Sequence, residues 1–311
     1  MRKRQQLGGA LCLLGAALVW GFCFVAQDLG ARYVDAFTFQ ATRNILAVIL
    51  LGTLILCRDA YKKKKGTYTS ASRAEKRMLL VGGTLSGIAL CVASALQQLG
   101  IANNTTSPGK DAFVTALYIV MVPVLGLFLG KRAKPHVYAC VGVALFGLWM
   151  LCMSGSTLSV GDIQVICCAM VFAVQIVILD HYAPRVDGVK LAFVQFFVVA
   201  VISTVPMLLF ERPTIESILL AKGAILYAGI GSTAVGYTLQ ILGQRSTPST
   251  VASLIMSLES VFAVLASAIL LPELTPFSGR EVIGMVLIFA AIIVSQLELP
   301  LPGRAKTKKQ N

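Results

Sequence analysis

The sequence is poor in charged residues, and few stretches interrupt its apolar character. Only 13% of the 311 residues are charged, 57% are hydrophobic, and the mean hydropathy is +0.80. No soluble domain of this length spreads so much apolar surface along nearly its whole sequence. A soluble globular class is therefore excluded, and the sequence predicts an all-α polytopic membrane protein.

Motifs of common catalytic and metal sites are missing. The eight cysteines include no C-x-x-C pair and lie within or at the edges of apolar segments, which does not favour a disulfide framework or a zinc site. No nucleophile stands beside a plausible base, and no nucleotide-binding domain is present. We therefore expect no enzymatic activity, no metal, no cofactor and no direct use of ATP.

Acidic residues are scarce beside basic ones. The sequence has 14 Asp and Glu against 27 Lys and Arg, which gives a formal net charge of +13. Nucleic-acid-binding proteins also carry such a charge, but here the basic residues lie in the termini and in connecting loops, as they do in membrane proteins. We expect contact with a lipid bilayer and none with nucleic acid.

Ten apolar segments are candidates for crossing the membrane, and most are joined by short loops rich in Gly, Pro, Ser or Asn. They are Leu7–Ala26, Phe37–Cys57, Met78–Leu99, Gly109–Gly130, Val137–Met153, Ile163–Leu179, Leu191–Phe210, Gly223–Leu242, Thr250–Leu271 and Val282–Leu297.

The distribution of basic residues sets the orientation. If the N-terminus is cytoplasmic, most Lys and Arg fall on that side, in the termini and in the loops that the ten segments leave there. Arg43 lies inside the second segment, and the opposite side holds only Arg32, Lys110, Arg212, Lys222 and Arg280. The asymmetry predicts a multi-pass protein of the cell membrane with both termini in the cytoplasm.

The two halves of the sequence resemble each other. Matching residues recur in order at slowly drifting offsets, as in Asp35 and Asp187, Leu99-Gly100 and Leu242-Gly243, and Ser107-Pro108 and Thr247-Pro248. Five segments per half is an odd number, so the second copy must be inverted relative to the first, as in secondary transporters. We expect one repeat over residues 7–153, a second over 160–298, and a basic cytoplasmic tail over 299–311.

Glu259 is the leading candidate for a functional residue. It lies eleven residues past Pro248 in an apolar segment, at a depth of about 16 Å, roughly half of the hydrocarbon core. A carboxylate at that depth is costly, so it should face a wet cavity or a partner. It can bind and release a proton, pair with a cationic group of a substrate, or form a structural hydrogen bond to a neighbouring helix.

Arg43, Gln97 and Gln240 are further candidates for substrate binding. The Arg43 guanidinium can hold a carboxylate, or it can extend to the outer membrane interface. Gln97 and Gln240 occupy matching positions in the two halves, where their amides can bind a ligand from opposite sides or bridge helices.

Aromatic residues and one charged pair complete the candidate set. Trp20, Tyr118 and Tyr237 fall within segments rather than at their ends, where cavity lining and ordinary packing are both plausible. Lys110 and Asp111 open the fourth segment, where they can flank the outer mouth of a cavity or form an ion pair at a helix terminus.

The motifs themselves resemble a known family. Ala16–Val25, Ala41–Asn44 and Ala252–Glu273 are similar to the EamA family of the drug/metabolite transporter superfamily, in two tandem copies. Ser260 stands where that family often has proline, and Pro272 where it often has glycine. The resemblance implies a ten-helix transporter with a central cavity, and its members carry amino acids, other metabolites or drugs.

The residues and the resemblance together predict a secondary transporter that moves a small organic solute by alternating access. Proton-coupled export through Glu259 is the preferred coupling. An uncoupled facilitator or exchanger is the alternative, and so is an interaction or sensory protein on the same fold. The small residues of the fifth and tenth segments can form a homodimer face or pack within the chain.

Overall fold

The computed structural model describes residues 2–103, 108–152, 159–270 and 279–296, and all regular structure in these ranges is helical. Long apolar sequences favour helices in a membrane because a helix satisfies its backbone hydrogen bonds within one segment. The helices of the first half are α1 (Arg2–Ala31), α2 (Ala36–Lys64), α3 (Arg73–Asn103), α4 (Pro108–Thr115), α5 (Tyr118–Phe128) and α6 (Pro135–Cys152).

The second half contains two π-helical segments and a short 3₁₀ turn among its α-helices. Its elements are α7 (Val160–Tyr182), η1 (Ala183–Arg185), α8 (Gly188–Pro206), η2 (Met207–Glu211), α9 (Ile215–Leu220), α10 (Lys222–Leu226), η3 (Tyr227–Gly236), α11 (Tyr237–Gln244), α12 (Ser249–Met256), α13 (Glu259–Leu270) and α14 (Gly279–Gln296).

The prediction of a polytopic all-helical membrane protein is confirmed. Eight helical segments in the described part of the chain are long and apolar enough to cross a membrane. The helices at the predicted fifth and tenth segments are shorter over their apolar stretches, Pro135–Met150 and Val282–Ser295. The count of ten spans therefore stays a prediction.

Four of the predicted segments are divided between elements, and Leu191–Phe210 is shared by α8 and η2. Gly109–Gly130 divides into α4 and α5, Thr250–Leu271 into α12 and α13, and Gly223–Leu242 into α10, η3 and α11. The hydroxyls of Ser253 in α12 and of Ser257, which follows that helix, donate to carbonyls three residues back, at 2.9 and 2.8 Å, which competes with the helical pattern of the backbone. Apolar periodicity does not report such local interruptions.

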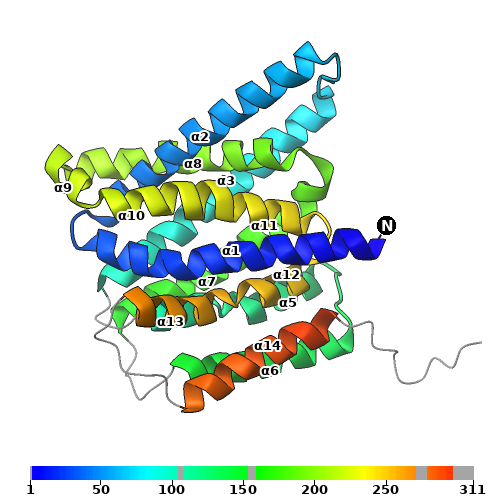
Figure 1. Ribbon diagram of the computed structural model, residues 1–311, viewed down its shortest axis with the longest axis vertical. Helices are drawn as coiled ribbons and strands as arrows, with labels where there is room; N and C mark the ends of the chain where they lie inside the picture. The colour runs from blue at the N-terminus through cyan, green and yellow to red at the C-terminus, as the bar shows by residue number, and fades with distance from the viewer. Residues whose placement is uncertain (1, 104–107, 153–158, 271–278, 297–311) are drawn as a thin grey trace, which may run out of the picture.

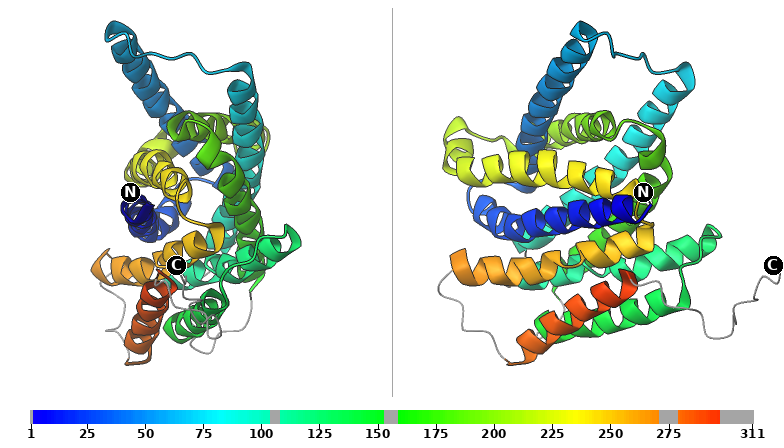
Figure 2. Two further views of the ribbon diagram at one scale, coloured as in Figure 1. Left: turned by 90° about the vertical axis from the view of Figure 1, so that its right-hand side faces the viewer. Right: turned by 45° about the vertical axis from the view of Figure 1, so that its right-hand side comes forward.

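Helices from the two halves are interleaved (Figures 1 and 2). α3 packs along α7, α2 along α8, and α6 along α14, while α1 lies between α11 and α13. Large apolar side chains such as Ile49, Leu56 and Phe128 are exposed on the outside of the bundle. An apolar exterior is suited to contact with lipid.

The α6–α14 pair accounts for the small residues that allowed a dimer face. A Cβ atom added at Gly147 would lie 2.8 Å from the backbone oxygen of Gly284, so the two helices approach each other closely. Packing within the chain thus explains these glycines, and a homodimer stays a prediction.

Two close helix contacts repeat the same geometry in the two halves. A Cβ added at Gly100 of α3 would lie 2.9 Å from the Gly161 backbone oxygen of α7. A Cβ added at Gly243 of α11 would lie 2.9 Å from the Gly9 backbone oxygen of α1. Glycine is required at both positions because any side chain would separate the helix backbones.

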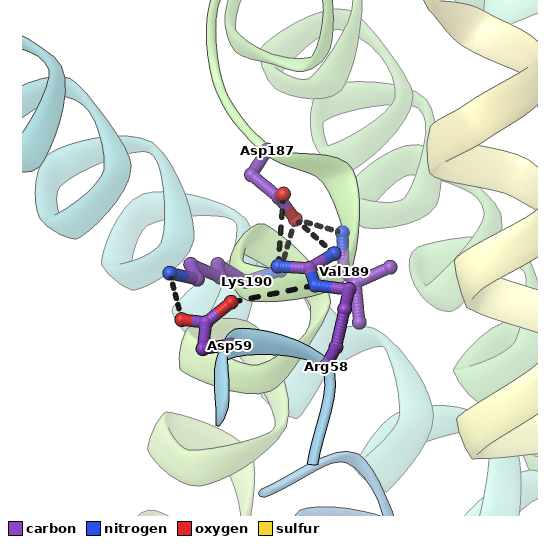
Figure 3. Close-up of polar contacts among 5 residues, drawn as sticks. All are labelled: Arg58, Asp59, Asp187, Val189 and Lys190. Atoms are coloured by element: carbon purple, nitrogen blue, oxygen red, sulfur yellow. Dashed lines mark hydrogen bonds and ion pairs between the residues drawn. The ribbon is translucent and has the colours of Figure 1, made fainter. Parts of the chain in front are cut away.

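Charged residues join the ends of α2 and α8 (Figure 3). Arg58 contacts both carboxylate oxygens of Asp187, at 3.3 and 3.0 Å, and Lys190 lies 2.6 Å from Asp59. Asp187 is also the N-cap of α8, where it accepts from the backbone N–H groups of Val189 and Lys190, both at 3.1 Å.

A related contact joins the other ends of the same two helices. Glu211, at the end of η2, accepts from the backbone N–H groups of Phe37 and Thr38 at 2.7 and 2.5 Å, and from the Thr38 hydroxyl at 2.7 Å. A carboxylate is favourable there because the N-terminus of α2 carries a partial positive charge. Polar contacts thus hold α2 and α8 together at both ends.

We expect Gly100→Ala and Gly243→Ala each to destabilise the protein by about 1–3 kcal/mol, the usual cost of overpacking. Gly142→Ala is the matched control, because a Cβ at Gly142 of α6 would meet no atom within 4 Å. The measurement is the thermal unfolding midpoint in detergent. Equal midpoints for all three variants would show that the close contacts are not required.

The Asp187 carboxylate should make the stability of the protein depend on pH. Burial raises the pKa of Asp187, but the Lys190 backbone N–H and the Arg58 guanidinium lower it by more, so that the pKa lies below its ordinary value. A lowered folded-state pKa contributes stability that is complete above the unfolded value of about 3.9 and is lost as the pH falls through the folded value.

The variants Asp187→Asn and Asp187→Ala separate the ion pair from the helix cap. Asn can still cap α8 but cannot pair with Arg58, so Ala should cost about 1 kcal/mol more than Asn. The difference in unfolding midpoint between wild type and Asp187→Asn should be constant from pH 8 to 5 and shrink only below about pH 4. A difference that shrinks between pH 8 and 6 would contradict the assignment.

Candidate functional site

Two interrupted helices meet at the centre of the bundle. The α4–α5 interruption covers residues 116–117 and the α12–α13 interruption residues 257–258. Both contain backbone bonds that span three residues, from Leu117 to Val114 and from Leu258 to Ile255, each 3.2 Å long. As a result Tyr118 is the first residue of α5 and Glu259 the first residue of α13. Interrupted helices of this kind form ligand sites in many transporters.

A small cavity lies at these interruptions. Its walls come from α1, α2, α3, α7, η3 and α11 in addition to the two interrupted helices. The space open to the centre of a water molecule is about 30 Å³, whereas sites for drug-sized ligands usually enclose 300 Å³ or more. The cavity in this conformation therefore holds a few water molecules but no organic solute.

Seven of the nine candidates from the sequence line this one cavity. They are Trp20, Arg43, Gln97, Tyr118, Tyr237, Gln240 and Glu259. Lys110 and Asp111 are also buried but are not among the lining residues.

Arg43 and Glu259 are the two charged residues among those that line the cavity. Each is 4% exposed, and neither forms an ion pair within the part of the chain that the structure describes. Nε of Arg43 and Oε1 of Glu259 are buried without a hydrogen-bond partner, and the Arg43 guanidinium lies 5.7 Å from the centre of the Phe39 ring. Buried charges left in this state need a counter-ion, a proton or a ligand.

The two matching amides are bound to other glutamines. Gln97 accepts from Gln27 at 3.1 Å and donates to Thr115 at 3.3 Å. Gln240 exchanges two hydrogen bonds with Gln175, at 3.2 and 3.4 Å. Both amides therefore bridge neighbouring helices at the wall of the cavity. In this conformation their N–H and C=O groups form hydrogen bonds with other side chains of the protein.

Aromatic rings form one side of the cavity. The rings of Trp20 and Tyr237 have centroids 4.7 Å apart, and Trp20 donates through Nε1 to the backbone oxygen of Ser232 in η3 at 3.4 Å. The Tyr118 hydroxyl is buried and lies beside the Glu259 carboxylate. The cavity thus offers ring faces and a hydroxyl next to the two charges.

Lys110 and Asp111 do not line the cavity. Lys110 is the third residue of α4 and contacts Asp162, the third residue of α7, at 2.8 Å, and both side chains are at least nine-tenths buried. Asp162 also forms a reciprocal cap with Ser159 at the start of α7. The partner of Lys110 was not predicted, because nothing in the sequence relates residues 52 positions apart.

Several lining residues were missed by the sequence analysis. Gln27 lines the cavity but lies one residue past the predicted end of the first segment. Had the first segment been extended past Ala26, Gln27 would have been recognised as a polar residue within a membrane helix. Thr115 and Ser232 also line the cavity, but they have no distinguishing signal, since isolated hydroxyl residues are common in membrane helices.

A scan against protein-family models finds the EamA-like transporter family twice in the chain, at residues 7–153 and 159–296. An uncharacterized transporter of Archaeoglobus fulgidus is 27% identical over 298 residues, which cover 95% of this chain and 88% of that protein. The uncharacterized transporter YrdR of Bacillus subtilis is 26% identical over 167 residues, or 52% of this chain and 49% of the relative.

Among solved structures, one crystal structure of a protein shares the fold with a TM-score of 0.68. The match covers 93% of this chain and 96% of the other, at 19% sequence identity. At that identity the likeness concerns the fold alone.

Proposed function

The chain belongs to the EamA-like transporter family, and from this membership we propose that it is a secondary transporter for a small zwitterionic organic solute, such as an amino acid. The solute would bind in the central cavity and cross the membrane by alternating access. Arg43 would bind its carboxylate and Glu259 its cationic group, while Trp20 and Tyr237 contact its apolar part.

The observation that carries this proposal is the pair of unpaired charges in one cavity. A carboxylate and a guanidinium that served only structure would be expected to pair with each other or with neighbours, because each is costly to bury alone. Arg43 and Glu259 do neither among the described residues. A ligand that carries both charges would satisfy both residues and leave the site neutral.

The size of the cavity supports alternating access. At about 30 Å³ it is too small for an organic solute, so binding requires part of the bundle to move. The two interrupted helices, α4–α5 and α12–α13, supply the places where short segments can tilt.

The repeated contacts support two inverted repeats as the moving units. The Gly100–Gly161 and Gly243–Gly9 contacts have the same geometry, and α4 and α12 both have eight residues and both end at an interruption. We propose that the repeats span residues 7–153 and 160–298, with the 299–311 tail and the N-terminus in the cytoplasm.

The two ends of the bundle differ in how they are closed. The buried Lys110–Asp162 pair joins α4 to α7 at one end. At the other end, where α12 begins, a pocket of about 310 Å³ is present. We assign the Lys110–Asp162 pair as a gate that closes the outer side.

Charge-removing substitutions test the site. Glu259→Gln and Arg43→Gln should each weaken solute binding by about 10- to 100-fold, since a hydrogen bond to a charged group contributes roughly 1.5–3 kcal/mol. Binding would be measured as thermal stabilisation by amino acids, by their amides, which lack the carboxylate, and by the corresponding acids, which lack the amine. Wild type should prefer the complete zwitterion.

Exposed charges provide the matched controls. Glu216→Gln and Arg77→Gln remove the same groups at exposed positions and should leave binding unchanged. In proteoliposomes, a pH gradient should drive transport by wild type but not by Glu259→Gln if Glu259 carries the proton. Transport by wild type that ignores the gradient would favour the uncoupled facilitator, and binding unaffected by either cavity substitution would refute the zwitterion site.

The gate has its own test, which uses a native cysteine. Cys23 lines the cavity and is 2% exposed. In a variant that retains only Cys23, Lys110→Gln should raise labelling by a membrane-impermeant maleimide from the outside at least tenfold, because loss of one partner of a buried pair costs about 3–5 kcal/mol.

Lys131→Gln is the control for this experiment. It breaks the Lys131–Asp180 contact of 2.5 Å at the opposite end of the bundle and should not increase labelling from the outside. The gate assignment is wrong if the Lys110 variant labels at the wild-type rate, or if the Lys131 variant is the one that labels faster from the outside.

A further inference from the structure

A second pocket, larger than the central cavity, is lined by residues at the starts of α1 and α12. Both helices begin at the same end of the bundle (Figure 1). About 310 Å³ are open to the centre of a water molecule. The walls come from the first turns of α12, the connection between α5 and α6, the end of α7 and the start of α1. None of the residues proposed to bind the solute is among its lining residues.

The lining of this pocket is strongly basic. Lys131, Arg132 and Lys134 lie along the α5–α6 connection, and His136 is the second residue of α6. Asp180 is the acidic residue of the lining, and it contacts Lys131 at 2.5 Å. Arg132 and Lys134 form no ion pair among the described residues, so the pocket has a positive excess.

The start of α12 adds unsatisfied hydrogen-bond donors. The N-cap of this helix is Pro248, which supplies no capping side chain. The Ser249 backbone N–H donates to Asp180 at 3.0 Å, and the regular helical bonds begin at Ala252. Among the described contacts, the N–H groups of Thr250 and Val251 have no acceptor, and Thr250 is buried. A buried helix start with free donors and a positive dipole end attracts an anion.

Thr247 is an independent observation at the same place. Its side chain lines the pocket and is 5% exposed, and its hydroxyl oxygen has no hydrogen-bond partner. A buried hydroxyl usually has a partner, because an unmade hydrogen bond is costly. This oxygen lies against Gly9 of α1, where an added Cβ would be 2.8 Å away, so a turn of the Thr247 side chain would bring the hydroxyl to a ligand oxygen in the pocket.

We propose that this pocket binds the phosphate group of an anionic ligand, held by Arg132, Lys134, the start of α12 and the Thr247 hydroxyl. Phosphate fits because it presents several acceptor oxygens to donors that converge from separate elements. The Asp180 carboxylate occupies the first of the helix-start donors and leaves the next two to the ligand. The phosphate can belong to an anionic phospholipid or to a soluble phosphate compound, and the protein groups that recognise it are the same.

The test compares two sources of phosphate on the purified full-length protein. In detergent, the unfolding midpoint is measured against inorganic phosphate, with chloride at matched ionic strength as the reference. In bilayer discs, the midpoint is measured in phosphatidylcholine alone and with added phosphatidylglycerol. We expect saturable stabilisation in at least one arm, and the responding arm identifies the source.

Two pocket variants and one control decide whether the effect arises here. Arg132→Gln/Lys134→Gln should weaken the response at least tenfold. Lys64→Gln/Arg73→Gln removes the same charge from exposed positions outside the pocket and should respond like wild type. The Thr247→Val variant removes a hydroxyl that has no protein partner, so it should fold as well as wild type and still lose several-fold in affinity.

The proposal is overturned by a flat response in both arms, or by equal responses of the pocket double variant and the control double variant. Neither result depends on transport, so the pocket and the transport function can fail separately.

Discussion

Two buried charges without counter-ions are the constraint around which the centre of this protein is built. A guanidinium and a carboxylate at Arg43 and Glu259 are 96% removed from solvent and unpaired among the described residues. Hydrophobic packing alone would not retain them, because replacing such groups with apolar side chains is commonly neutral or stabilising. They are therefore the basis of the proposed solute site, and the neighbouring amide pairs and aromatic rings hold the helices in place around it.

The charges also break the likeness between the two halves. Arg43 is the eighth residue of α2, and the eighth residue of α8 is the neutral Gln195. Glu259 opens α13, and the residue that opens α5 is Tyr118. The two similar halves therefore form the scaffold of the cavity. The first half contributes the positive group, Arg43, and the second half the negative group, Glu259, so the proposed site has one positive and one negative side. A ligand with two unlike ends fits this arrangement better than a symmetric one.

Much of this was accessible from the sequence, for identifiable reasons. Long apolar runs reveal helices in a membrane, and a charge inside such a run is noticeable because of its cost, so Arg43 and Glu259 could be selected. The interruptions at residues 116–117 and 257–258 could not be found, because they arise from backbone bonds and serine hydroxyls that leave the apolar pattern intact. A single sequence also does not reveal which residues pair over a long distance in the chain, as Lys110 and Asp162 do.

The difference between the ends of the bundle follows from the same departure from symmetry. Lys110 and Asp162 are the third residues of α4 and α7, and the offset of 140 that relates Ser107-Pro108 to Thr247-Pro248 places Thr250 opposite Lys110. An offset of 152, which relates Arg43 to Gln195, places Ala10 opposite Asp162. The residues at the matching positions of the other half are therefore uncharged, and the pocket lined by Thr250 lies at that end. In the proposed mechanism the two ends would not open at equal cost, because the Lys110–Asp162 pair at one end is buried and the Lys131–Asp180 contact at the other is partly exposed. The proposed transporter would then rest with its outer side closed, without a separate element to bias it.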